Sequence, residues 1–444
     1  MRELLNPVEL IIGWMWATIP ETEVHVVVRR ATNPVRIGSF NQTVVLDAIR
    51  RSDGLSRVEL AASTGLSAQA VTNICRRLIA AGLVREAGTE NVGRGKPRTM
   101  LRLEPGARLA VGVHLDPAVV TVALLDLEGT VLAQQSLATP SALDPPHAVA
   151  TITSAVDAVI SSAAADRERI LGVGVAAPGP VDLHRGVVDN PPNLPGWHQV
   201  PLREELARAT GLPVLLDKDV TAAAVAETWW GQPRRAGTSA VLYIGTGIGA
   251  GLVVDGEVVR GSSGNAGEVG HIVVDPDGPP CACGQRGCVA VTLAPSALLE
   301  QARERGIVSG TTSGATSAAA LGELFDRADA GDPAARSVVG HAVTGIARLA
   351  LVVTNLLDLD RLVLGGPYWA RIAPYYLDQG PGQMSAGAAA RLIHDVEVVG
   401  TSIGEHFGAV GAASLVLDHA FSVHPGSLVE HVPANTPRAR RART

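Results

Sequence analysis

Three of the four cysteines lie close together in the second half of the chain. Cys281 and Cys283 are separated by one residue, Cys288 follows after four more, and His271 precedes the group by ten residues. Three thiolates and one imidazole complete the four ligands of a tetrahedral Zn²⁺ site, which is the closed arrangement of a structural metal. Three cysteines cannot pair off as disulfides. The spacing therefore predicts a structural zinc ion, whereas the isolated Cys75 is expected to be a small buried side chain.

The composition indicates a water-soluble α/β protein. The chain has 444 residues, of which 46% are hydrophobic, 18% charged and 3% aromatic. This length allows two to four domains, and the abundance of small aliphatic side chains argues against a coiled coil or a disordered chain. The longest apolar runs are shorter than the roughly 18 residues of a membrane span. Because the first residues also lack the basic start of a secretory signal, we expect a cytoplasmic protein without a membrane segment.

The charge is divided unevenly along the chain. Residues 40–102 carry ten Lys and Arg against five Asp and Glu, whereas residues 103–437 carry a net charge of −15. A small basic segment before a large acidic body is the pattern expected when one domain meets a polyanion and another has a different task.

The basic segment has the signals of a helix-turn-helix. A helical pattern begins at Phe40, and Ser56 with Glu59 forms the sequence of a capping box at the start of a short helix. Gly65 supplies the turn, and Ser67 can cap a third helix. The buried side of this third helix is expected to consist of Val71, Ile74 and Leu78.

The opposite side of the third helix carries side chains that can read the major groove. Gln and Asn can pair with adenine, Thr can contact the methyl group of thymine, and Arg can reach guanine or phosphate. Two expected strands, 83–85 and 100–102, flank a glycine-rich basic loop over 93–98, which forms a wing suited to the minor groove or to phosphates. The residues expected to contact double-stranded operator DNA are Ser67, Gln69, Thr72, Asn73, Arg76, Arg94, Lys96 and Arg98.

Strands and helices alternate through the rest of the chain. Aliphatic strands are expected at 109–113 and 121–125, a helix at 147–163, and a further strand at 170–175. Such alternation predicts mixed sheets covered by helices, and the length of this part predicts two lobes.

Several motifs of this body resemble those of the ROK family of repressors and sugar kinases. The resemblance covers about residues 37–420 and implies a two-lobed, actin-like and ribonuclease H-like fold. A winged helix ahead of such a body resembles the repressor branch, whose members control the use of xylose, glucose and N-acetylglucosamine. The motifs are GSSGNAGEVGH at 261–271, CACGQRGC at 281–288, AAPGPVD at 176–182, GTGIGAG at 245–251, LGG at 364–366 and GAVGAA at 408–413.

The resemblance also implies a sugar site with altered residues. Asp219 occupies the position of the catalytic base and is expected to be vestigial, while Lys218 replaces an Asn that contacts sugar hydroxyls and Ala290 replaces a Glu. Lys218 either pairs with Asp219 and lowers its proton affinity or binds an acidic group of a ligand. We expect a sugar unlike glucose, such as a pentose or a sugar acid, or no sugar at all. The expected sugar-binding residues are Asn193, Lys218, Asp219, Glu268 and His271.

The phosphate loop departs further from the family pattern. Family kinases read DxGGT after the first strand, whereas this chain has His114, Asp116 and Pro117 in the corresponding segment. Both glycines are lost, and proline removes a backbone donor. These differences imply that ATP does not bind and that the chain is not an enzyme.

We therefore expect a ligand-responsive transcriptional regulator, a repressor of carbohydrate-utilisation genes, acting as a homodimer or a dimer of dimers. Two alternatives remain: an ATP-dependent sugar kinase with a DNA-binding appendage, and a regulator that binds DNA without an effector. The expected parts are a disordered extension at 1–36, the winged helix at 37–102, a first lobe at 108–235 completed by a helix at about 403–420, a second lobe with the zinc site at 236–402, and a basic tail at 433–444.

Overall fold

A computed structural model describes the chain from residue 34 to 422 except for residues 91–96, 141–143, 193, 195, 232–236, 310–314, 390–392 and 405. The extension expected at 1–36 falls almost entirely outside the described residues, and the tail expected at 433–444 falls wholly outside them. The chain divides into two compact units, residues 1–41 and 42–444.

The first elements form a winged helix. Helix α2 (Pro34–Arg50) is followed by α3 (Arg57–Thr64) and α4 (Ala68–Ala80), and strands β1 (Leu55–Ser56), β2 (Val84–Glu90) and β3 (Arg98–Leu103) pair in the antiparallel order β1-β3-β2. The prediction that the first helix begins at Phe40 was wrong by six residues. Proline is tolerated in the first turn of a helix, where its missing N–H has no partner to lose, so Pro34 can start α2 before the apolar periodicity becomes visible.

The first lobe is built on a five-stranded sheet. Strands β4 (Leu109–Leu115), β5 (Val119–Leu125) and β6 (Val131–Ala138) form an antiparallel meander, and β7 (Ile170–Ala177) and β10 (Val214–Lys218) extend it in parallel in the order β10-β7-β4-β5-β6. Helices α5 (Pro145–Ser162) and α6 (Leu202–Thr210) pack against each other, and α5 also packs on β5 and β6. The short strands β8 (Val181–Asp182) and β9 (Val187–Val188) pair separately.

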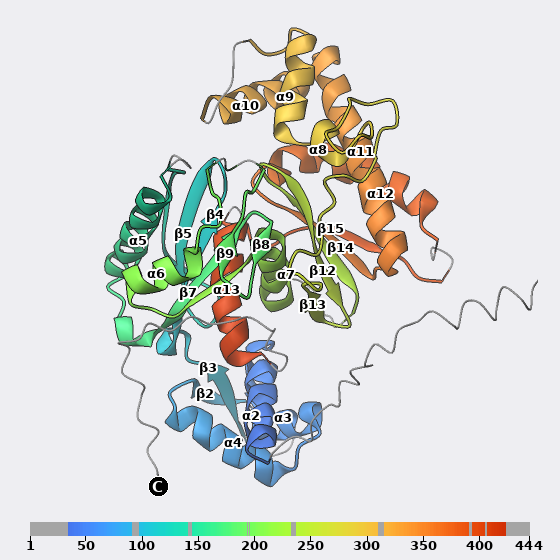
Figure 1. The fold of residues 1–444 in the computed structure, drawn as a ribbon. Coiled ribbons are helices and arrows are strands. Elements are labelled where there is room, and N and C mark those ends of the chain that lie inside the picture. Colours follow the sequence, from blue (N-terminus) through green and yellow to red (C-terminus); the bar gives the residue numbers. More distant parts are fainter. Residues whose placement is uncertain are drawn as a thin grey trace, which may run out of the picture. The chain divides into compact units, whose positions relative to one another are not determined.

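The last described helix packs on the strands of the first lobe. Helix α13 (Phe407–Phe421) lies against β4, β5 and β7 (Figure 1). A Cβ atom on Gly112 or Gly174 would overlap the backbone oxygens of Ala409 or Ala412. Glycine is therefore required at both strand positions for the helix to approach the sheet this closely.

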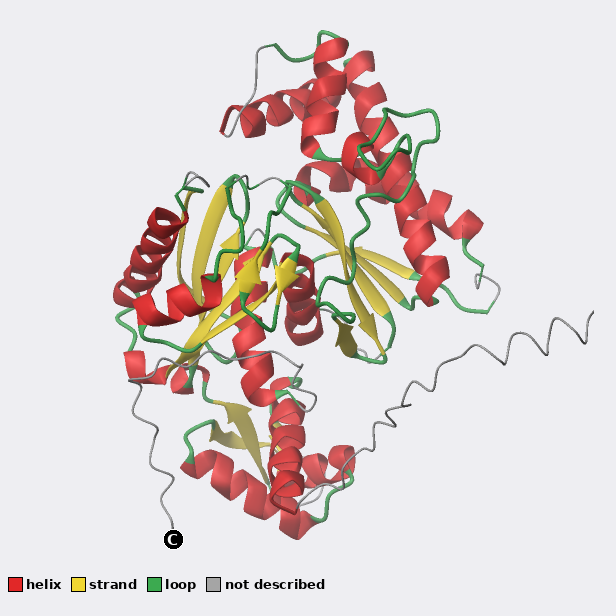
Figure 2. Cartoon of the chain, viewed as in Figure 1, coloured by secondary structure: helices red, strands yellow, loops and turns green. Residues whose placement is uncertain are grey.

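The second lobe has its own five-stranded sheet and most of the remaining helices (Figure 2). The strands are β11 (Ser239–Ile244), β12 (Ile248–Val254), β13 (Glu257–Val259), β14 (Arg361–Gly365) and β15 (Glu397–Gly400), in the order β13-β12-β11-β14-β15. The helices are α8 (Val289–Thr292), α9 (Pro295–Glu304), α10 (Ala315–Asp329), α11 (Pro333–Leu357) and α12 (Trp369–Gly387). Within the described residues, α11 alone is long and apolar enough to cross a membrane, but 61% of its apolar window is buried in this lobe.

Helix α7 (Asp219–Trp230) packs against both lobes. Its residues Val220, Ala223 and Ala224 belong to a core shared with strands of the second sheet, whereas Ala222 and Val225 belong to the core of the first lobe and α13. The predicted fold class, a winged helix before a two-lobed α/β body, is confirmed.

Candidate functional site

The turn between α3 and α4 is held by local hydrogen bonds. The backbone N–H of Ser56 donates to Glu59 Oε2 at 2.9 Å, and the Ser56 hydroxyl donates to the same oxygen at 2.7 Å. These hydrogen bonds lower the pKa of Glu59, which stays ionised as a cap. Gly65 ends α3 with φ 69°, and Ser67 Oγ accepts a hydrogen bond from the N–H of Ala70 at the start of α4. The predicted capping box and turn are confirmed.

Helix α4 has one buried and one accessible side. Its buried residues are Val71, Ile74, Cys75 and Leu78. Gln69 and Arg76 are exposed, whereas Asn73 is half-buried. The hydroxyl of the half-buried Thr72 donates to the carbonyl of Ala68 within the helix at 2.7 Å. Its methyl group therefore remains the part available for an apolar contact with thymine.

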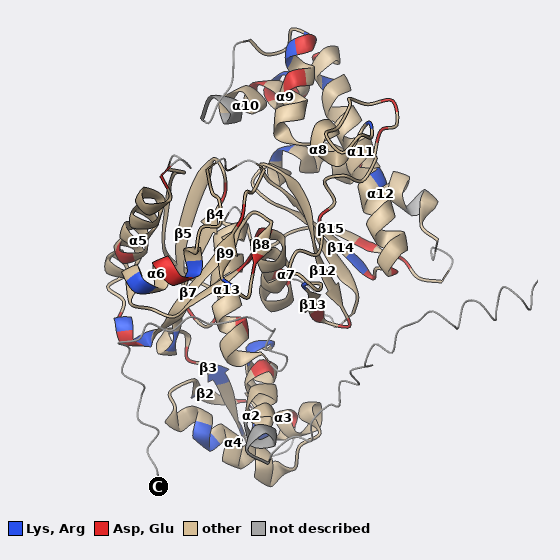
Figure 3. Ribbon diagram, viewed as in Figure 1, with Lys and Arg blue, Asp and Glu red and all other residues tan. Residues whose placement is uncertain are grey.

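Basic side chains also lie on the β1-β3-β2 sheet of the winged helix. Figure 3 shows basic residues on α4 and β3. Arg98 begins β3, and its guanidinium lies 3.7 Å from Glu59 Oε1. Arg94 and Lys96, the other cations expected in the wing, lie outside the described residues.

The cysteine cluster gathers in a loop after β13. The ligand atoms of His271, Cys281, Cys283 and Cys288 all lie within 4.8 Å of one another. The Sγ atoms of Cys283 and Cys288 are 3.6 Å apart, and His271 Nδ1 lies 3.4 Å from Cys281 Sγ. A tetrahedron with Zn–S bonds of about 2.3 Å has edges of about 3.8 Å, so the four residues fit a metal ion of this size.

Burial opposes a free thiolate at Cys288. Desolvation, together with the neighbouring Cys283 and Cys281, raises the pKa of this thiol to about 12. Three thiolates at this separation need a cation to be stable together. The loop requires glycine at position 287, because Gly287 has φ 62° and a Cβ there would overlap the carbonyl oxygen of Asp275.

Two of the residues expected to bind sugar, Lys218 and Glu268, meet at the end of β10. Lys218 Nζ lies 2.5 Å from Glu268 Oε1, and the lysine side chain is 4% exposed whereas that of Glu268 is 62% exposed. A Cβ on Gly179 would lie 3.1 Å from Lys218 and 3.0 Å from Glu268, so the loop at 176–182 borders this pair. Asn265 holds that loop through two hydrogen bonds to the backbone of Val181. Asn193 lies outside the described residues.

The interpretation of Lys218 as the ion-pair partner of Asp219 was wrong. Lys218 pairs with Glu268 instead, and the charge of Lys218 only partly offsets the effect of burial on Asp219. Desolvation dominates and raises the pKa of Asp219 to about 7. The carboxyl group is therefore a better proton acceptor than an exposed aspartate.

The strand that carries Lys218 is fixed by a buried ion pair that the sequence did not indicate. Arg260 Nε donates to Asp217 Oδ2 at 2.8 Å, and the Asp217 side chain is fully buried. The other oxygen of Asp217 accepts a hydrogen bond from the N–H of Lys218. The backbone at Lys218 is thereby held in place next to the Glu268 pair.

The segment that contains His114, Asp116 and Pro117 makes several contacts with protein groups. The hydroxyl of Thr246 lies 2.9 and 2.8 Å from the two carboxylate oxygens of Asp116, and the N–H of Ala118 also donates to this carboxylate. His114 is buried against Gly408, where a Cβ would lie 2.5 Å from the ring. Burial lowers the pKa of His114, so its imidazole is neutral near pH 7. The remaining cavity, bordered by Tyr243, measures about 180 Å³.

Comparison with known proteins decides the family. A model of the ROK family matches residues 110–419, and a model of the MarR family matches residues 39–95. The chain belongs to the ROK family. The predicted family resemblance is thus confirmed.

Individual relatives of this ROK protein include both regulators and kinases. It is 26% identical to the xylose repressor of Bacillus subtilis over 86% of this chain and 96% of the repressor. It is 32% identical to a glucokinase of Thermotoga maritima over 56% of this chain and 80% of the kinase. The crystal structure of a ROK family transcriptional regulator, a homologue of the Escherichia coli Mlc protein, matches with a TM-score of 0.70 and 26% identity over 87% of this chain and 97% of that one.

Proposed function

We propose that this ROK protein is a DNA-binding transcriptional repressor of carbohydrate-utilisation genes, whose affinity for operator DNA is set by a carbohydrate bound in the body. The observation that carries the proposal is the extent of the match. The similarity to the xylose repressor includes the winged helix, whereas that to the glucokinase covers 56% of the chain. The exposed side of α4 supplies the donors and acceptors that base recognition needs.

The proposed DNA contacts are those of the recognition helix and the wing. Gln69 and Asn73 read base edges, Thr72 contacts a thymine methyl group, and Arg76 binds guanine or phosphate. Ser67 caps α4 with its side-chain oxygen, so its role is to orient the helix start next to a phosphate. Arg94, Lys96 and Arg98 bind the backbone or the minor groove as the wing.

The proposed body senses a ligand and does not transfer phosphate. Asp116 places a carboxylate in the segment that would cradle phosphate, and a like charge there opposes ATP. Asp219 retains a carboxyl group able to accept a hydroxyl proton, but the proposed loss of the nucleotide site leaves it without a phosphoryl donor.

The proposed effector competes with Glu268 for Lys218. The Lys218 side chain is buried and stays in the site, whereas the Glu268 side chain is exposed and can rotate into solvent at little cost in free energy. A ligand with a carboxylate, such as a sugar acid, can take the place of Glu268 on Lys218, while a neutral sugar can bridge the two groups with its hydroxyls. Asp219, Asn193 and His271 are proposed to complete the site.

The proposed cofactor is one structural Zn²⁺ ion held by the histidine and three cysteines of the cluster. Bound there, it cross-links the loop that follows Glu268 and supplies no open coordination position for catalysis. The protein is proposed to be a cytoplasmic homodimer or dimer of dimers, which lets ligand binding set the spacing of two winged helices on DNA.

One alternative is favoured by a specific observation. Lys218 and Glu268 neutralise each other without a ligand, and the side chain of Ala290 offers no hydrogen bond to a sugar. Both features are expected of a body that no longer binds a ligand. The protein would then be a constitutive DNA-binding regulator. The kinase alternative rests on the similarity to glucokinase.

DNA binding is tested by fluorescence anisotropy on a duplex from the region upstream of the protein's own gene. Arg76→Ala is expected to weaken binding by about tenfold, since a lost base or phosphate contact costs about 1–3 kcal/mol. Arg208→Ala is the matched control, because Arg208 is exposed on α6 and pairs with Glu205. Equal binding by both variants, or sugar-dependent ATP turnover by the unaltered protein, would overturn the proposed function.

A further inference from the structure

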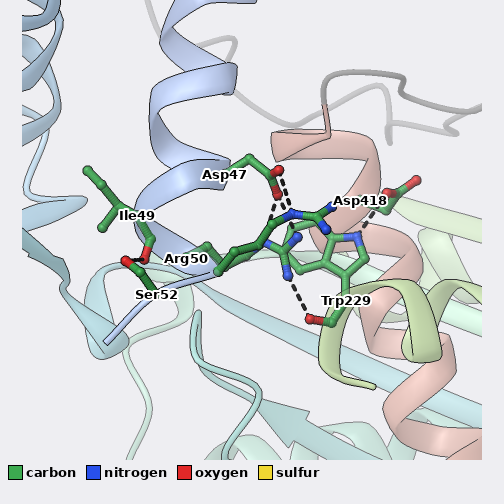
Figure 4. A network of polar contacts seen from close by, with 7 residues as sticks. Asp47, Ile49, Arg50, Ser52, Trp229 and Asp418 are labelled. Carbon is green, nitrogen blue, oxygen red and sulfur yellow. Dashed lines mark hydrogen bonds and ion pairs between the residues drawn. The ribbon is translucent and has the colours of Figure 1, made fainter. Parts of the chain in front are cut away.

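Arg50, the last residue of α2, contacts the C-terminal end of α7. Its Nη1 donates to the carbonyl oxygen of Trp229 at 2.7 Å, and its guanidinium carbon lies 4.1 Å from the centroid of the Trp229 ring (Figure 4). The Trp230 ring centroid is 5.9 Å away. Only 6% of the Arg50 side chain is exposed, so this contact is made away from water.

Arg50 and Trp229 each have a further hydrogen-bond partner that fixes the orientation of the side chain. Asp47, one turn earlier on α2, accepts hydrogen bonds from Arg50 Nε at 3.1 Å and from Nη2 at 2.5 Å. The indole N–H of Trp229 donates to Asp418 on α13 at 2.9 Å. The planar guanidinium is thus fixed in orientation, and a shift of Trp229 must move Arg50 or break its hydrogen bond.

The other end of α7 lies in the candidate sugar site. Lys218 is the N-cap residue of the helix, and Asp219 is its first residue. The helix has 12 residues, so about 18 Å separates the two ends. The first half of α7 is closely packed: Gly251 of β12 and Gly411 of α13 each approach its backbone so closely that a Cβ would clash.

A cavity lies beside the Arg50 contact. It measures about 720 Å³ and is bordered by the end of α2, the end of α7, the turn between β12 and β13, and the start of β14. Because this space is not filled by side chains, the end of α7 can be displaced here without a clash in the core.

We propose that Arg50 is the residue through which α7 communicates the state of the Lys218 site to the winged helix. A ligand that separates Lys218 from Glu268 shifts the start of α7, the rigid helix carries this shift to Trp229, and Arg50 transfers it to α2. The effector acts on one end of this helix, and DNA acts on the other end through the winged helix. An element whose position depends on both ligands is the physical requirement for allosteric coupling. The inference rests on the proposed function and adds its route of regulation.

Hydrogen exchange tests this coupling without DNA and without the natural effector. Lys218→Met serves as the perturbation of the sugar site in the full-length protein, and the peptide covering residues 44–52 reports on the end of α2. With Arg50 present, Lys218→Met is expected to change the exchange rate of this peptide by about fivefold, within the usual range of coupling factors. In an Arg50→Ala background, the same substitution is expected to leave the rate unchanged.

Arg51→Ala is the matched control. Arg51 is the next residue and donates to Oδ2 of the same Asp47, at 2.7 Å, whereas Arg50 uses Oδ1 and also bonds to Trp229. Arg51→Ala should preserve the response to Lys218→Met, whereas Arg50→Lys, which keeps the charge but loses the planar fork, should abolish most of it. Circular dichroism confirms that each variant is folded. An equal response in the Arg50→Ala and Arg51→Ala backgrounds, or no response in the unaltered background, overturns the proposal.

The DNA affinity of the same variants separates this proposal from the proposed function. In the unaltered background, Lys218→Met should change the Kd for the upstream duplex. In the Arg50→Ala background, the same substitution should leave the Kd nearly unchanged. If no variant binds DNA, the proposed function fails, and the exchange measurement still decides whether Arg50 couples the two sites.

Discussion

The carboxylate of Asp116 and the hydroxyl of Thr246 join the two lobes across the cleft. Asp116 lies in the turn between β4 and β5 of the first lobe, and Thr246 lies in the glycine-rich turn between β11 and β12 of the second. A hydrogen bond between protein side chains therefore links the two lobes directly.

Loss of this link should destabilise the body. Thr246→Val keeps the size of the side chain but removes the donor, and we expect the free energy of unfolding to fall by about 1 kcal/mol. Urea denaturation measures the change. Thr153→Val is the control, because the Thr153 hydroxyl bonds only to the preceding turn of its own helix, and it should be nearly neutral. A Thr246→Val protein as stable as the control would show that the link contributes nothing.

The Lys218–Glu268 pair should respond asymmetrically to substitution. Glu268→Gln leaves a buried ammonium group that still donates to the carbonyl oxygen of Ala266 but has lost its counter-charge, so we expect a loss of about 1–2 kcal/mol in the free energy of unfolding. Lys218→Met leaves only the exposed Glu268, which can turn into water, and should cost less. The double variant should recover part of the loss caused by Glu268→Gln. Denaturation curves at pH 7 measure all three, and a larger loss for Lys218→Met than for Glu268→Gln would argue against this description of the pair.

The raised pKa of Asp219 should appear as a pH-dependent cost. Its pKa is about 7 in the folded chain, compared with 3.8 for an exposed aspartate. Between these values the folded chain binds a proton that the unfolded chain does not, so this group makes the protein less stable as the pH rises from about 4 to 7. Asp219→Asn removes the titration. Its stability relative to the unaltered protein should therefore increase between pH 5 and pH 8 by more than about 1 kcal/mol, and a difference that is constant with pH would be inconsistent with the raised pKa.

The cysteine cluster should carry one zinc ion per chain. Elemental analysis of the purified protein is expected to find this ratio, and Cys283→Ser is expected to lose the metal and lower the melting temperature. Cys75→Ala is the control, since Cys75 is buried in α4 outside the cluster. Retention of zinc by Cys283→Ser, or its loss from Cys75→Ala, would rule out the proposed ligand set.

Local signals were sufficient for the winged helix. The capping pair Ser56 and Glu59, the turn at Gly65 and the cap at Ser67 act over three or four residues, and the structure contains each of them. The cysteine spacing was similarly informative because three ligands lie within eight residues of one another. The start of α2 was misplaced because Pro34 begins a helix before its apolar face can be recognised.

Long-range partners could not be found in the same way. Lys218 is adjacent to Asp219 in the sequence but pairs with Glu268, and Arg50 meets Trp229 across 179 residues. These pairings depend on how β10, α7 and the loop after β13 are placed by the cores of the two lobes. A single sequence records the residue types but not this placement, so Lys218 and Glu268 could be named as candidate sugar-binding residues whereas the ion pair between them could not be predicted.

We propose that a carbohydrate bound in the body controls the affinity of the winged helix for DNA. The most direct measurement is fluorescence anisotropy of the purified protein on its upstream duplex at fixed salt, titrated with pentoses, hexoses, amino sugars and sugar acids. We expect one class of compound to shift the midpoint by about fivefold or more, and this shift to disappear in Lys218→Met, which removes the group that holds the effector. Binding to DNA that no compound alters would contradict the claim and identify the protein as a ligand-independent regulator.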